Sequence, residues 1–125
     1  MSRYPIVKSG PHPTEFILTE ANGQRSRDNA YFVDPTTVQV GQPCKKTADA
    51  TTDTPATYVL ATVGADCKAL TLYGGTSMSG EGLHVSVITR DCEVNGRCIN
   101  WGSLSQAEQV AGVAALATVG IIVRI

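Results

Sequence analysis

The chain has 125 residues, of which 42% are hydrophobic and 17% charged, and its formal net charge is −1. This length fits one domain, and the hydrophobic share is sufficient for a core, which excludes a disordered polar tail. The balanced charge disfavours a general nucleic-acid binder, because phosphate contacts require an excess of Lys and Arg. It equally disfavours a polybasic protein of the membrane surface.

Neither a membrane span nor a secretion signal is expected. The uncharged stretch 110–123 is shorter than the roughly 20 apolar residues that a spanning helix needs, and it contains Gly112 and Gly120. The N-terminus has no apolar run typical of a signal peptide. We therefore expect the protein to stay in the cytoplasm in which it is made, or to leave by cell lysis.

Residues 1–14 are predicted to form an extended N-terminal arm. Pro5, Pro11 and Pro13 remove hydrogen-bond donors and push the residues before them toward extended backbone. Two interpretations remain open. The arm is either a frayed terminus or a segment that becomes ordered on a partner.

From Glu15 onward, short apolar runs between turn residues predict a single β-rich domain over residues 15–125. Runs expected to form strands are 15–19, 37–40, 58–63, 69–73, 83–89 and 121–125. Asn22-Gly23 is a strong turn signal, and 93–98 around Asn95-Gly96 is interpreted as a tight hairpin. Exposed loops are expected at 47–57, which is rich in Thr, Ala and Asp, and at 74–82, which is rich in Gly and Ser.

One helix is predicted, over residues 103–118. Ser105 followed by Glu108 fits a capping box, in which the Glu side chain reaches back to the cap amide, and Ser103 is an alternative start. Gly120 is placed to end the helix in a left-handed conformation. The face expected to lie against a sheet carries Ala107, Val110, Ala111, Ala114 and Thr118.

The residues that usually carry catalysis do not form a recognisable set. The two histidines, His12 and His84, lie in the arm and in a predicted strand, and no Gly-x-Ser-x-Gly elbow is present. Loop 74–82 lacks the lysine of a phosphate-binding loop and precedes a strand rather than a helix. Asp91 and Glu93 are interpreted as a solvated turn rather than an acid–base pair. We expect no enzyme activity, no catalytic residues and no cofactor.

The four cysteines are Cys44, Cys67, Cys92 and Cys98. Their long, irregular gaps contain no Cys-x-x-Cys pair, so a structural zinc site is not expected. Free and largely buried thiols are the favoured interpretation. The most conceivable disulfide is Cys92–Cys98, which flanks the Asn-Gly turn.

Three other residues allow two interpretations each. Arg25 and Arg27, near Asp28, are either a surface ion-pair group of small stabilising value or an interface anchor. The single tryptophan, Trp101, precedes the predicted helix. Core packing is its expected role, and an interface role is the alternative.

Two stretches resemble the bacteriophage lambda-type head decoration protein family. The first is 20–28, Glu-Ala-Asn-Gly-Gln-Arg-Ser-Arg-Asp. The second runs from 90–96 through Ile99-Asn100-Trp101 into the predicted helix and 120–124. The resemblance covers about residues 15–125 in order, and its C-terminal layout is a strand ending in Trp, a loop into a helix and a closing apolar strand.

This resemblance implies a small β-rich, β-clip-like fold with one C-terminal helix. It implies homotrimers that bind the outside of an expanded phage head at threefold and quasi-threefold positions and stabilise it against packaged DNA. The implied partners are the major capsid protein and other copies of the chain, without nucleic acid or membrane. The implied location is the outer surface of the virion, with the host cytoplasm as the site of assembly.

On this resemblance, residues 1–14 together with 15–27 are expected to bind the capsid. Phe16 and Leu18 would fill capsid pockets and Arg25 and Arg27 would pair with capsid carboxylates, while Trp101 would lie in the trimer interface. The expected capsid-binding residues are Glu15, Phe16, Ile17, Leu18, Thr19, Glu20, Asn22, Arg25 and Arg27.

Two functions of other classes stay open on the residues alone. The first is a monomeric β-rich module that binds a ligand or glycan through loop 74–82. The second is a small zinc or redox protein that uses the cysteines.

Overall fold

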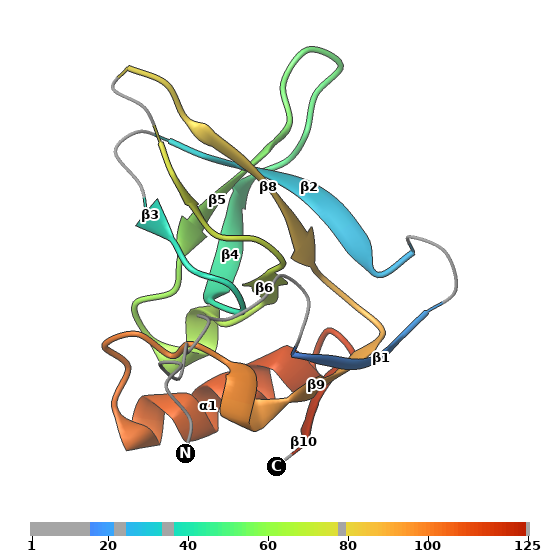
Figure 1. Ribbon diagram of the computed structural model, residues 1–125. Coiled ribbons are helices and arrows are strands. Elements are labelled where there is room, and N and C mark those ends of the chain that lie inside the picture. The colour runs from blue at the N-terminus through green and yellow to red at the C-terminus, as the bar shows by residue number, and fades with distance from the viewer. Residues whose placement is uncertain (1–15, 22–24, 34–36, 78–79, 125) are drawn as a thin grey trace, which may run out of the picture.

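The computed structural model describes residues 16–21, 25–33, 37–77 and 80–124 (Figure 1). The described chain is mostly β, with a single α-helix near its C-terminal end, as the sequence predicts. The strands are β1 (Ile17–Glu20), β2 (Arg27–Phe32), β3 (Thr37–Val38), β4 (Pro43–Ala48), β5 (Ala56–Leu60), β6 (Ala69–Thr71), β7 (Gly75–Thr76), β8 (Leu83–Ile88), β9 (Cys92–Asn95) and β10 (Ile121–Arg124). The helix is α1 (Gln106–Ala117), and two short 3-10 helices are η1 (Gly64–Asp66) and η2 (Gly96–Cys98).

Five strands close into a small barrel in the order β2-β5-β4-β6-β8. β2 pairs parallel with β5 and antiparallel with β8, and the remaining pairs are antiparallel. Alternation along β8 turns Val85 and Val87 inward. Together with Phe32 and Tyr58 they fill the interior, so the barrel is packed rather than hollow.

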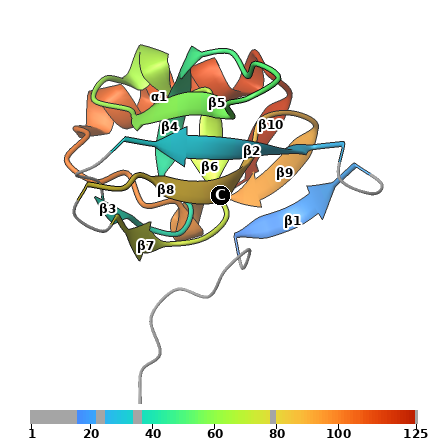
Figure 2. The same cartoon turned by 90° about the horizontal axis from the view of Figure 1, so that it is seen from above.

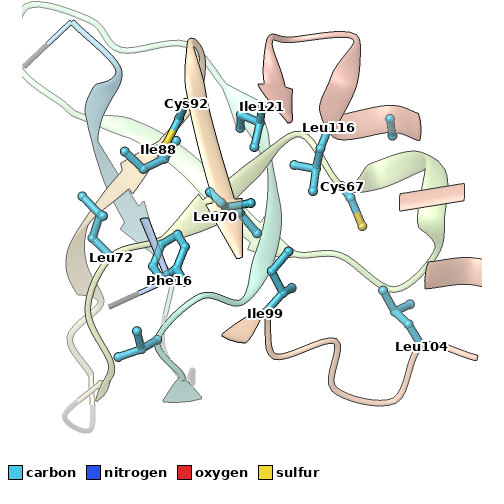
Figure 3. Close-up of a cluster of buried hydrophobic side chains, with 13 residues drawn as sticks. Phe16, Cys67, Leu70, Leu72, Ile88, Cys92, Ile99, Leu104, Leu116 and Ile121 are labelled. Atoms are coloured by element: carbon cyan, nitrogen blue, oxygen red, sulfur yellow. The ribbon is translucent and has the colours of Figure 1, made fainter. Parts of the chain in front are cut away.

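A second, three-stranded sheet has the order β1-β9-β10 and lies beside the barrel (Figure 2). β1 is antiparallel to β9, and β10 is parallel to it. The inward faces of this sheet, the end of the barrel and α1 enclose the larger core (Figure 3). Its fully buried side chains include Phe16, Leu70, Leu72, Leu116 and Ile121.

Helix α1 begins and ends where the sequence signals place it. Ser105 is the N-cap, and its hydroxyl accepts the amide of Glu108 at 3.3 Å. Gly120, with φ +84°, stops the chain in the left-handed region before β10, because a side chain there would be strained. One detail of the predicted capping box is wrong, since the Glu108 carboxylate accepts the backbone N–H of Gly64 in η1 instead of the cap amide. This bond fastens η1 to α1.

The predicted buried face of α1 is also wrong. Ala107, Val110, Ala111, Ala114 and Thr118 are all exposed in the structure. The side that packs inward instead carries Gly112, Ala115 and Leu116. Because small apolar residues occur on both sides of this helix, periodicity alone selected the wrong one.

Three loop and turn predictions differ from the structure. The expected loop 47–57 contains the end of β4 and the start of β5, and only 49–55 lies between these strands. Loop 74–82 contains the short strand β7, which pairs with β3. Residues 93–98 are not a hairpin, because β9 is followed by η2 and pairs with β1 and β10. The predicted arm 1–14 and the Asn22-Gly23 turn lie outside the described residues.

Candidate functional site

The described residues contain no cluster of three or more His, Cys, Asp or Glu that could hold a metal ion. His84 lies on strand β8, where its ring tilts against Tyr31 with the ring centroids 4.9 Å apart. It is therefore a surface residue of the sheet, as its sequence position indicates. His12 lies outside the described residues.

All four cysteines are free thiols in the structure, so the conceivable Cys92–Cys98 disulfide is not formed. Cys44, Cys67 and Cys92 are buried, and Cys98 is half-buried. Burial raises the pKa of Cys67 and of Cys92 to about 11, and it raises the pKa of Cys44 further. Thiols that stay protonated at neutral pH are poor nucleophiles, so these three act as small core residues.

Strand β1 places the predicted binding residues in different environments. Leu18 is exposed over 52% of its surface, which leaves it free to contact a partner. Phe16 is fully buried among Leu70, Leu72 and Ile99 (Figure 3), so the expectation that its ring fills a capsid pocket is corrected. The two side chains diverge because the register of β1 against β9 is irregular between Ile17 and Thr19.

Glu20 and Arg27 form a two-point ion pair that joins the end of β1 to the start of β2. Arg27 Nε donates to Glu20 Oε2 at 3.0 Å, and Arg27 Nη2 donates to Oε1 at 2.6 Å. Hydrogen bonding to Arg27 lowers the pKa of Glu20, and the same contact raises the pKa of Arg27. Arg27 is therefore engaged within the subunit.

Arg25 is far more available than Arg27. Its side chain is 72% exposed, and its Nε lies 3.8 Å from Asp91 Oδ2, itself on an exposed side chain. The predicted partner Asp28 pairs instead with Arg90, whose Nη2 donates to Asp28 Oδ2 at 2.6 Å. Of the two arginines expected at the interface, only Arg25 is free of a close ion pair in the described chain. Glu15 and Asn22 lie outside the described residues.

A polar row crosses the outer face of the three-stranded sheet. Thr19 Oγ1 donates to Glu93 Oε2 at 2.7 Å, and Arg124 donates through Nε and Nη2 to Glu93 Oε1 at 2.9 and 2.6 Å. Two contacts hold the pKa of Glu93 below its usual range. The hydrogen bond from Thr19 has the larger effect, and the Arg124 guanidinium has the next largest. Three strands are thus tied together on the face that also carries the half-exposed Ile122. Asp91 takes no part in this row, so the predicted solvated turn at Asp91 and Glu93 is only half right.

Trp101 lies in an apolar groove between α1, η2 and β10. A Cβ built on Gly112 would lie 2.8 Å from the Trp101 ring, so the indole packs closely over the helix at that glycine. The groove has a volume of about 200 Å³ and is lined by Gly96, Arg97, Trp101, Gln106, Gln109, Val110, Val113 and Val123. Trp101 is half-buried, which agrees with core packing and leaves part of the ring open to a partner. The sequence did not indicate this groove: Val110 was expected on the buried face of the helix, and Val113 and Val123 were not singled out.

Among the other hollows on the described surface, two adjoin the loops expected from the sequence. One, of about 360 Å³, lies beside the β3–β7 pair and is lined by 37–40 and 74–76, none of which is charged. The other, of about 560 Å³, lies under loop 49–55 and reaches Asp28 and Tyr58. Burial raises the pKa of Tyr58 to about 12, so its hydroxyl stays protonated. Neither hollow brings together a nucleophile and a base.

Comparison with protein families identifies the family to which the chain is similar. The model of a family described as bacteriophage lambda head decoration protein D matches residues 6–121. Neither the curated proteins nor the solved structures give a match. In the described part of the chain, no helix has the length and apolar character needed to span a membrane.

Proposed function

Because the chain belongs to the family of bacteriophage lambda head decoration protein D, we propose that it binds the outside of an expanded phage head as a homotrimer. The family is a structural one, and membership implies a component of the virion capsid. The match over residues 6–121 carries the proposal, since it spans nearly the whole chain. The proposal further includes binding at threefold and quasi-threefold positions of the head, stabilisation of the head against packaged DNA, and assembly in the host cytoplasm.

The proposed capsid-binding element consists of the arm 1–14 and strand β1, and its proposed partner is the major capsid protein. Within the described residues β1 pairs only with β9, so its other edge is open. An open edge accepts an added strand, whose backbone hydrogen bonds give affinity while alternate side chains give selectivity. Leu18, exposed on this strand, supplies an apolar contact.

The charges around β1 favour a revised set of contacts. Arg25 is proposed to pair with a capsid carboxylate, because its side chain is exposed and its nearest acid, Asp91, is 3.8 Å away. Arg27 is proposed to act indirectly, by holding Glu20 and hence the end of β1 in place. Trp101 remains the proposed trimer-interface residue, since its groove is open at the surface.

Co-sedimentation with expanded heads that lack their decoration protein tests this function, with unexpanded shells as the reference. The full chain is compared with a variant lacking residues 1–14 and with Leu18→Asp. Val59→Asp on β5 is a matched control, because it places the same charge on another exposed aliphatic residue. Each variant is also checked for oligomeric mass and thermal unfolding.

We expect saturable binding of the full chain to expanded heads, at a multiple of three copies per site. The deletion and Leu18→Asp are expected to weaken binding while the protein stays folded and trimeric, and Val59→Asp is expected to bind normally. Absence of binding to cognate heads of either form contradicts the proposed function. Unchanged binding of both β1-side variants contradicts only the location of the contact.

A further inference from the structure

The outer side of helix α1 carries almost no charge. Glu108 is the helix's one charged residue, and Val110, at the centre of the outer side, is 63% exposed. Apart from Gln106 at the start of the helix, the remaining exposed positions are occupied by small apolar residues, Ala107, Ala111, Ala114 and Ala117. A surface helix of a monomeric domain normally presents charged and polar residues on this side.

The apolar surface continues beyond the helix on both flanks. On one flank, Val63 and Ala65 of the η1 region are exposed beside α1. On the other flank lies the groove between α1 and β10, lined in part by Trp101, Val113 and Val123. We call this surface the α1 face, made up of Val63, Ala65, Trp101, Ala107, Val110, Ala111, Val113, Ala114, Ala117 and Val123. It lies across the end of the molecule opposite loop 49–55 (Figure 1).

Charges that border the α1 face on the η1 side are already paired within the subunit. The Glu108 carboxylate accepts the Gly64 amide, and Asp66 pairs with Lys45 at 3.2 Å. Lys68 Nζ donates to the Thr118 hydroxyl at 2.9 Å. A partner on this side therefore needs no countercharge, and a charged partner surface would lose its water without gaining an ion pair.

We propose that the α1 face is the contact between copies of this chain. A second copy supplies a largely apolar surface of the kind that the α1 face can cover, and its alanines allow close backbone approach. Arg97 is the one charged residue among those that line the groove. The proposal rests on the homotrimer proposed above and names its interface. A decoration protein must stay in solution until a head is ready, so a surface covered only by the capsid would stay exposed during that time. Monomeric soluble proteins rarely leave contiguous apolar patches of this kind uncovered.

The geometry of the α1 face also suits a ring. Its two flanks differ, since one is the groove with Trp101 and the other is the exposed surface at Val63. Contacts between unlike patches are head-to-tail, and they close into a ring when the rotation between copies permits. A threefold ring uses the groove flank and the Val63 flank of each copy, which leaves no apolar flank unpaired.

Equilibrium sedimentation of Val110→Glu tests the proposal. The wild type is expected at three times the 13.2 kDa of one chain. Since burying an unpaired carboxylate in an apolar contact is strongly unfavourable, Val110→Glu should raise the concentration for half-dissociation by about 100-fold or more. Val59→Glu, with the same charge at an exposed valine on β5 outside the face, should change it less than about threefold. Ala114→Glu serves as a second variant on the face.

Thermal unfolding and head binding separate the outcomes. Dissociated variants that unfold at the wild-type temperature support the proposal, because the fold is then intact and only assembly is lost. A trimeric wild type with trimeric Val110→Glu and Ala114→Glu overturns it while the proposed function stands. Trimeric variants that no longer bind heads would assign the face to the capsid instead, which also overturns it. A monomeric wild type that still binds heads removes the trimer and leaves capsid decoration in place.

Discussion

Arg27 and Arg25 are two residues apart, yet we expect their removal to affect different properties. Arg27→Ala breaks two charge-assisted hydrogen bonds to Glu20, in a pair whose side chains are 28% and 21% exposed. Exposed pairs contribute up to about 1 kcal/mol, and a partly buried two-point pair lies at the upper end of that range. For a domain of this size, 1 kcal/mol corresponds to a fall of about 4 °C in the unfolding temperature.

Arg25→Ala should leave the unfolding temperature within about 1 °C, because its contact with Asp91 is long and both side chains are largely exposed. Its binding to expanded heads should nevertheless weaken, since Arg25 is the arginine proposed to reach the capsid. Circular dichroism on heating at pH 7 and co-sedimentation measure the two effects on the same samples. Arg27→Lys is a useful control, because it keeps the charge but loses the two-point geometry. Equal thermal losses for Arg25→Ala and Arg27→Ala would refute this reasoning.

Three further predictions concern the rest of the molecule. The depressed pKa of Glu20 stabilises the fold above the unfolded value of about 4.3. This contribution should disappear as the pH falls through the folded pKa, and Arg27→Ala should flatten that part of a plot of unfolding temperature against pH. Gly64→Ala should cost about 3 kcal/mol in urea unfolding, since its Cβ would overlap the backbone of α1, and a loss below about 1 kcal/mol would contradict the close packing. In native protein a thiol reagent should modify Cys98 fastest, because it is only half-buried, and should modify the buried Cys92 slowly. All four thiols should react in denaturant, and a count of two there would reveal a disulfide.

Local signals were sufficient for the helix ends and for most strands. Ser105 and Gly120 act through their own backbone and side-chain chemistry, so their effect is visible without tertiary contacts. Strand β4 was missed because it carries Lys45 and Lys46, which disfavour a strand on pattern alone. In the structure β4 pairs on both sides, with β5 and β6, and backbone hydrogen bonds to two neighbours hold a polar strand in place.

The orientation of side chains was harder to predict than the elements themselves. Leu116 and Val110 are both apolar and point to opposite sides of α1, so nothing local distinguishes core from surface. The neighbouring elements decide which side of α1 is buried. The Trp101 ring packs over the helix at Gly112, and Gly64 allows η1 to approach the helix closely. The same limit applies to Phe16 and Leu18, whose alternation is broken by the irregular register of β1.

The two proposed surfaces are mechanically connected through one strand. β9 pairs with β1 on one side and β10 on the other, and β10 packs against α1. On its outer face Glu93 ties Thr19 to Arg124, so the strand that carries Leu18 is held by the strand that follows α1. A subunit contact at the α1 face would therefore also stabilise the position of β10 and, through β9, that of the open edge of β1. On this argument a variant that breaks the α1 face should weaken head binding more than the loss of three-arm attachment alone predicts. Glu93→Gln alone leaves the α1 face intact but weakens the polar row, so it should reproduce part of that extra loss in a protein that is still trimeric.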